Sequence, residues 1–204
     1  MSILIDDLPE EINGTPIHSD YRYMVMFEEL IRDPDLDNNE KFIRSLDLLY
    51  DGPVLDAQSA WDGLLWFYSG GQEKAERESG TDRKFRQVYD FEQDAERIYS
   101  AFWQIYGIDL QSAPLHWWSF RALLGNLPES CLMGEIMRIR ATDVGKLKGA
   151  ERKRIRYLQE VYAIKRTGTH ELLTAAERDR KMHEYVLRRH KEAAAWLENK
   201  KRGG

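Results

Sequence analysis

Hydrophobic residues along most of the chain recur at intervals of three or four, the spacing that gathers side chains on one face of an α-helix. Pro and Gly residues interrupt this pattern and mark the ends of separate helices. Residues 72–86 are charged and lack the periodicity, so we expect an exposed loop there. The expected helices span residues 19–31, 37–50, 56–68, 90–106, 112–124, 130–141, 151–164 and 174–199.

Small polar residues precede several of these segments and can cap a helix N-terminus. Ser19 and Asp56 are expected to cap the first and third helices. Asp90, followed three residues later by Gln93, resembles a capping box. Ser112 stands before Ala113-Pro114, and Pro is favoured in the first turn of a helix. We therefore expect helices to begin directly after these caps.

The segment around Asn13-Gly14 predicts a type I′ hairpin turn, because both central residues of that turn need positive φ. Pro16 confines the hairpin to an edge or to a very short element, which must lean on the helices. The predicted fold is all-α: a compact multi-helix bundle with a short N-terminal β-hairpin and a basic C-terminal helix that can protrude. The expected domains are a helical domain at 1–166 and a basic helical extension at 167–204.

Aromatic residues are concentrated in residues 89–124. An apolar stripe runs along 90–106, and further aromatic side chains widen it, which predicts burial on two sides. Apolar residues surround the next helix almost completely, so it is expected to be central. His116 and Trp117 are kept as an alternative anchor for a partner, because Trp is frequent among binding hot spots. The interpreted core signature is Tyr89, Phe91, Tyr99, Phe102, Tyr106, His116, Trp117, Trp118 and Phe120.

Charge is distributed unevenly along the chain. Residues 1–145 carry 13 Lys+Arg and 27 Asp+Glu, a net charge of −14, whereas residues 146–204 carry 17 and 8, a net charge of +9. The basic part either folds back on the acidic body or reaches an acidic partner, including nucleic acid. The expected partner-binding residues are Arg152, Arg156, Met182, Val186, Arg189 and Trp196.

Candidate chemistry is sparse. Asp90 and Asp94, like Glu92 and Glu96, are four residues apart, a spacing at which carboxylates can share a proton or hold a divalent ion. We favour a helix cap and a solvated acidic face instead. Cys131 is the only Cys and is expected to be a buried or half-buried thiol. No phosphate loop or nucleophile elbow is present, so we expect no enzyme activity, no cofactor and no metal.

No apolar run approaches the roughly 18 residues of a membrane span, so no membrane association is expected. The first residues lack the basic region of a secretory signal. A single Cys fits a reducing compartment. Oligomerisation is left open.

Several motifs resemble the bacteriophage "gene product fifteen" family of siphophage tail-gene clusters, over about residues 12–166. The central part reads Tyr89-Asp90-Phe91-Glu92-x-Asp94-Ala95, then Ile98-Tyr99-x-Ala101-Phe102, Tyr106-Gly107-Ile108-Asp109-Leu110 and Leu115-His116-Trp117-Trp118-x-Phe120. Shorter matches are Arg32-Asp33-Pro34-Asp35, Trp66-Phe67-Tyr68 and Ile139-Arg140-Ala141.

This resemblance implies a tail-assembly chaperone or accessory protein that works in the cytoplasm of the host bacterium, or of a bacterium that carries the prophage. Its implied partners are the tape-measure protein and the tail tube protein. Two alternatives stay open: a DNA-binding accessory protein that uses residues 146–204, and a structural tail or connector component of the virion.

Overall fold

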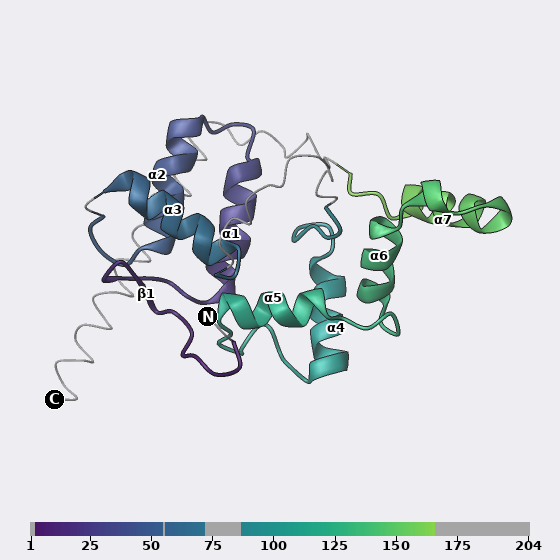
Figure 1. The fold of residues 1–204 in the computed structure, drawn as a ribbon, viewed down its shortest axis with the longest axis horizontal. Coiled ribbons are helices and arrows are strands. Elements are labelled where there is room, and N and C mark those ends of the chain that lie inside the picture. Colours follow the sequence, from purple (N-terminus) through teal and green to yellow (C-terminus); the bar gives the residue numbers. More distant parts are fainter. Residues whose placement is uncertain (1–2, 55, 72–86, 166–204) are drawn as a thin grey trace. The chain divides into compact units, whose positions relative to one another are not determined.

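A computed structural model describes residues 3–54, 56–71 and 87–165 (Figure 1). Within these ranges the chain forms seven α-helices, one 3-10 helix and a two-stranded antiparallel sheet. The all-α prediction with its N-terminal hairpin is therefore confirmed. The helices are α1 (Tyr21–Arg32), α2 (Asn38–Leu49), α3 (Ala57–Tyr68), α4 (Ala95–Tyr106), α5 (Trp117–Gly125), α6 (Leu132–Ala141), η1 (Val144–Lys146) and α7 (Gly149–Val161).

The hairpin forms as its turn residues predict. Strands β1 (Glu11–Ile12) and β2 (Thr15–Pro16) are antiparallel, and the residues between them, Asn13 and Gly14, have φ angles of 52° and 78°. The hairpin leans on α3, where an added Cβ at Gly63 would lie 2.7 Å from a side-chain carbon of Ile12. A larger residue at 63 would therefore push the hairpin away from the helix.

Helices α1, α2 and α3 pack in sequence, α1 against α2 and α2 against α3. Asp37 forms a capping box with Glu40 at the start of α2, and Asp56 accepts hydrogen bonds from two backbone N–H groups at the start of α3. The cap predicted at Asp56 is thus confirmed. Their shared core contains the fully or almost fully buried Met24, Phe27, Leu49, Leu64 and Phe67.

The caps predicted at Ser19 and Ser112 are wrong, for a shared reason. Residues on either side of Asp20 and His116 pair as short extended segments: the Tyr21 N–H donates to the Leu115 carbonyl, and the Trp117 N–H donates to the Ser19 carbonyl. Both helices can begin only after this bridge. Asp20 therefore caps α1, and His116 caps α5.

Helix α4 begins four residues later than a cap at Asp90 would place it, at Ala95. Asp90 caps an isolated turn instead, accepting from the N–H groups of Glu92 and Gln93 at 3.0 and 2.9 Å. The burial predicted for both sides of this helix is also wrong, because Trp103 is 55% exposed. Only one face of α4, with Ile98, Ala101 and Phe102, is buried.

Helix α6 packs against α4 and against α7. The buried Cys131 caps α6 by accepting the Gly134 N–H through its sulfur at 3.4 Å, so a buried thiol is confirmed. One compact unit extends to Ile164. The predicted helix at 174–199 lies outside the described residues, and the domain division at 166/167 stays a prediction.

No helix in the described ranges is long and apolar enough to span a membrane.

Candidate protein-binding site

Arg140, near the end of α6, holds the segment before α4 and the end of α7 together. Its guanidinium makes a two-pronged ion pair with Asp94, and both side chains are buried. It also donates to the carbonyls of Val88 and Tyr162, at 3.0 and 2.7 Å. Asp94 accepts further bonds from Arg97 at 2.8 Å and from the Asp90 N–H at 3.0 Å. A buried ion pair whose hydrogen bonds are all satisfied fixes the positions of the segments that it joins, because losing either charge leaves the other unpaired in the interior.

A second ionic cluster fixes the same segment to α1. Arg32 bridges Glu28 at 2.6 Å and Asp90 at 2.9 Å, and the Tyr68 hydroxyl donates to Glu28 at 2.7 Å. Burial raises the pKa of Glu28, although its bonds to Tyr68 and Arg32 act in the opposite direction. Asp90 and Asp94 thus each hold an arginine from a different helix, and the turn between them connects α1 to α6.

The interpretation of these carboxylates as a solvated acidic face is therefore wrong for this pair. Asp94 is fully buried and Asp90 is 9% exposed. Local spacing in the sequence could not predict these ion pairs, because Arg32 and Arg140 lie 58 and 46 residues away from their partners. The available signal was Arg140 itself, a charged residue next to the apolar face of a predicted helix.

The aromatic signature residues meet around α5. Phe91, Phe102, Trp117, Trp118 and Phe120 are buried. Trp117 and Trp118 donate from their indole N–H groups to the carbonyls of Tyr68 and Phe67, at 3.0 and 2.8 Å. These side chains tie α5 to the end of α3. Tyr89, Tyr99 and Tyr106 pack against this core, and His116 packs edge-on against Phe67; all four remain partly exposed.

The contacts of His116 fit a neutral imidazole that carries its proton on Nε2. Its Nδ1 accepts the Trp118 N–H at 3.0 Å, which leaves the proton on Nε2, 3.2 Å from the Pro9 carbonyl. Burial lowers the pKa of His116, against the opposing effects of Pro9 and Glu10. Both ring nitrogens of His116 are used and Trp117 is fully buried, while His116 itself stays partly exposed.

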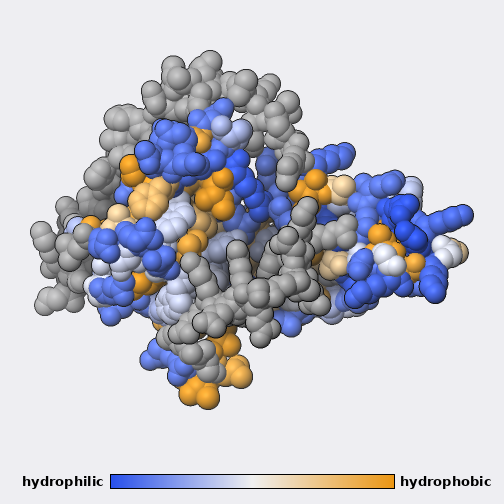
Figure 2. Space-filling model, turned by 45° about the horizontal axis from the view of Figure 1, so that its top comes forward, coloured by the Kyte–Doolittle hydropathy of each residue, from blue (hydrophilic) through white to orange (hydrophobic). Residues whose placement is uncertain are grey.

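Helix α7 has one buried face and one solvent face. Ile155, Leu158 and Tyr162 lie on the side that packs towards α6, and Gln159 donates to the carbonyls of Ile139 and Thr142, at 2.8 Å each. Tyr157 and Val161, one turn apart on the opposite side, are 64% and 51% exposed. The end of the molecule that holds α7 is largely hydrophilic with a small apolar patch, on the right of Figure 2.

Of the predicted partner-binding residues, the structure describes Arg152 and Arg156. Both are exposed and lie on the flank of α7, between its buried side and the side of Tyr157. Met182, Val186, Arg189 and Trp196 lie outside the described residues. Tyr157 and Val161 were missed because a helix pattern alone cannot say which of two apolar stripes faces the core.

Among the described residues, no group of three or more His, Cys, Asp or Glu is placed to hold a metal ion. A depression of about 240 Å³ lies beside α4 and the start of α6, with Arg97, Gln104 and Leu132 in its lining. Small-molecule sites usually enclose roughly 300–1,000 Å³. The depression is smaller than this range.

The fold and these contacts define a helical protein in which ionic side chains join the helices and one basic helix offers a mixed basic and apolar face. The family model described as "Bacteriophage Gp15 protein" matches residues 4–164. The chain belongs to this family and is a phage-related protein. Neither a search of curated proteins nor a search of solved structures found a match.

Proposed function

We propose that this chain is a phage tail-assembly chaperone or accessory protein that binds other phage proteins without a catalytic step or a cofactor. Its proposed partners are the tape-measure protein and the tail tube protein, and its proposed place of action is the bacterial cytoplasm. Membership of a phage protein family supports the general class. The binding role rests on the exposed basic and apolar side chains of α7. They lie outside the side of α7 that packs towards α6, and Arg140 holds the end of the helix.

The physical basis is the contact between an amphipathic helix and a partner. The proposed partner, the tape-measure protein, is a long helical chain with apolar stripes, and such a chain aggregates unless those stripes are covered. Tyr157 and Val161 offer apolar area, while the flank of Arg152 and Arg156 offers positive charge to acidic residues beside such a stripe. The bond from Arg140 to the Tyr162 carbonyl holds the end of α7 in place, so little conformational entropy is lost on binding.

Co-expression with the tape-measure protein of the same phage tests the proposal. The tape-measure protein is expected to be more soluble with this chain than without it. Arg152→Glu with Arg156→Glu should abolish the gain, while Lys41→Glu with Arg44→Glu on α2 is the matched control with the same change of charge. If the tape-measure protein is equally soluble with and without the chain, the chaperone role is wrong.

DNA binding is a second candidate, favoured by the consecutive exposed residues Arg152, Lys153 and Arg154. Phosphate contacts release counterions, so DNA retention would fall steeply with salt. Retention on duplex DNA at low salt that is lost in the Arg152→Glu and Arg156→Glu variant would favour this function over the first.

Mass spectrometry of purified particles separates a chaperone from a virion component. A chaperone is expected to be absent from mature particles, whereas a structural tail or connector protein would be present in a fixed number of copies.

A further inference from the structure

Two of the exposed apolar surfaces of the described chain differ in charge. The first is the N-terminal arm, residues 3–7, in which Leu4 and Ile5 are 90% and 85% exposed. The second is the outer face of α7, formed by Lys153, Arg154, Tyr157 and Val161. Neighbouring exposed apolar residues of this kind are candidates for a contact surface.

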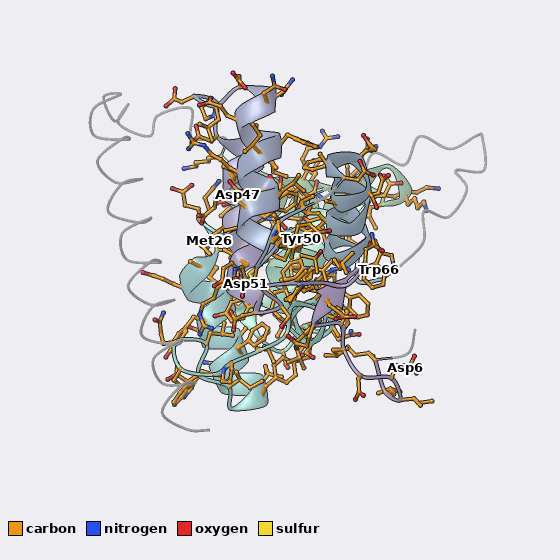
Figure 3. The ribbon with its side chains drawn as sticks, turned by 90° about the vertical axis from the view of Figure 1, so that its left-hand side faces the viewer. Asp6, Met26, Asp47, Tyr50, Asp51 and Trp66 are labelled. Atoms are coloured by element: carbon orange, nitrogen blue, oxygen red, sulfur yellow. The ribbon has the colours of Figure 1, made fainter. Side chains whose placement is uncertain are left out.

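The arm projects from an anchored base. Leu8 packs against the core, and the Pro9 carbonyl lies 3.2 Å from His116 Nε2. Figure 3 shows Asp6 on a loop that extends away from the helices. Residues 3–5 form a turn in the structure, and the five residues of the arm would reach roughly 17 Å if fully extended. This length is close to the roughly 20 Å of a helix with the 13 residues of α7.

The two surfaces are complementary in charge as well as in apolar character. Residues 3–11 contain four acidic residues and no basic one. Residues 143–165 contain seven Lys or Arg and three Asp or Glu, a net charge of +4. On α7, Lys153 and Arg154 lie one turn before Tyr157, so an arm that covers Tyr157 and Val161 brings Asp6 and Asp7 towards positive charge.

We propose that the N-terminal arm of one copy binds the outer face of α7 in a second copy. Within one copy the arm does not cover this face, since Ile5 and Tyr157 are both mostly exposed. Each copy carries one arm and one such face, so two copies can exchange arms reciprocally in a closed dimer, or each copy can bind the next one head-to-tail. Head-to-tail contacts close into rings or extend into filaments. This inference goes beyond the proposed function, because its partner is the chain itself.

Sedimentation velocity on the nuclease-treated, full-length chain tests the proposal over a range of concentration and salt. The wild type is expected to form oligomers that dissociate as salt rises, since charges that are only partly buried are screened. Leu4→Asp with Ile5→Asp, the arm variant, should weaken association at least about tenfold. Tyr157→Asp with Val161→Asp, the α7 variant, should do the same. Ile43→Asp, which replaces a 57% exposed apolar residue on α2, is the matched control and should associate like the wild type.

Mixing the two variants gives the decisive result. The arm variant keeps an intact α7, and the α7 variant keeps an intact arm, so together they are expected to form a one-to-one dimer that grows no further. A wild type that remains monomeric at its highest concentration overturns the proposal, as does a mixture that remains monomeric.

A charge reversal provides a second test that leaves every apolar contact in place. Asp6→Lys with Asp7→Lys should prevent association, and mixing this variant with Lys153→Glu and Arg154→Glu should restore it. Circular dichroism of each variant checks that the helices are intact. Continued association of the singly reversed chains at wild-type strength would exclude the arm–α7 contact. Failure of all these tests would leave the tape-measure experiment unaffected, because that experiment follows a different partner.

Discussion

Helices α5 and α7 are both rich in large side chains, yet they are buried to different degrees. Four of the nine residues of α5 are buried, namely Trp117, Trp118, Phe120 and Leu124, whereas Ile155 is the one buried residue among the thirteen of α7. Helix α5 connects α1, α3 and α4 through aromatic contacts and indole hydrogen bonds. Helix α7 is held through α6, Arg140 and Gln159. Changes in α5 should therefore act on folding, and changes on the outer face of α7 should act on binding.

The largest effect is expected from Trp117→Ala in α5. The side chain is fully buried and donates to the Tyr68 carbonyl, so its loss leaves both a cavity and an unpaired carbonyl. The free energy of unfolding should fall by about 3–5 kcal/mol, as measured by denaturant titration followed by circular dichroism. Trp103→Ala is the control, because Trp103 is 55% exposed. Equal losses for the two variants would contradict the contrast between core and surface.

Asp94→Asn should be the next most severe change, because it leaves the buried Arg140 charge without its partner. We expect a loss of about 3 kcal/mol in the free energy of unfolding. Hydrogen exchange should also become faster at the end of α7, which Arg140 holds through the Tyr162 carbonyl. Asp62→Asn, at an exposed position of α3, is the control.

A double variant, Asp94→Leu with Arg140→Met, separates the charge from the packing. It should recover much of the stability lost in Asp94→Asn, since apolar residues can replace a buried ion pair. It should not restore slow exchange at the end of α7, because the bond to the Tyr162 carbonyl is still absent. Slow exchange in this variant would show that Arg140 is not what holds α7.

Low pH should reduce the free energy of unfolding through His116, which caps α5. Burial lowers the pKa of His116 in the folded chain below its ordinary 6.5, so the unfolded chain binds the proton more readily. The stabilisation from neutral His116 is thus complete above that ordinary value and is lost as the pH falls below it. Protonation of Nδ1 also removes the helix cap, a contribution of about 1 kcal/mol.

His116→Asn provides the comparison, because Asn can cap a helix but does not titrate. Denaturant titrations between about pH 5 and pH 8 should show a flatter dependence of stability on pH for this variant than for the wild type. An unchanged slope would mean that other groups cause the acid sensitivity.

The smallest effect on stability is expected on α7. Tyr157→Ser should change the free energy of unfolding by less than about 0.5 kcal/mol, because the side chain is 64% exposed. Its association with a second copy should nevertheless weaken in sedimentation. A stability loss comparable to that of Trp117→Ala would mean that the outer face of α7 is part of the core.

Most helices and one turn could be predicted from local signals. Asp37 and Asp56 cap the helices that begin directly after them, because no distant segment of the described chain forms a bridge with the residues around these caps. Asn13-Gly14 adopts the positive φ angles of its turn. The errors fall where distant segments meet. Ser19 and Ser112 are adequate caps by residue type, but the bridge between Asp20 and His116 keeps the neighbouring residues extended.

The sequence by itself determined the helical class, the family and the concentration of positive charge near the C-terminal end, because these depend on composition, periodicity and ordered motifs. Only the tertiary structure decided that Asp94 is a buried partner of Arg140 rather than part of a solvated acidic face. It also decided which side of α7 is exposed. Both outcomes depend on contacts between residues far apart in the chain, and a local pattern carries no information about which distant group will replace water around a side chain.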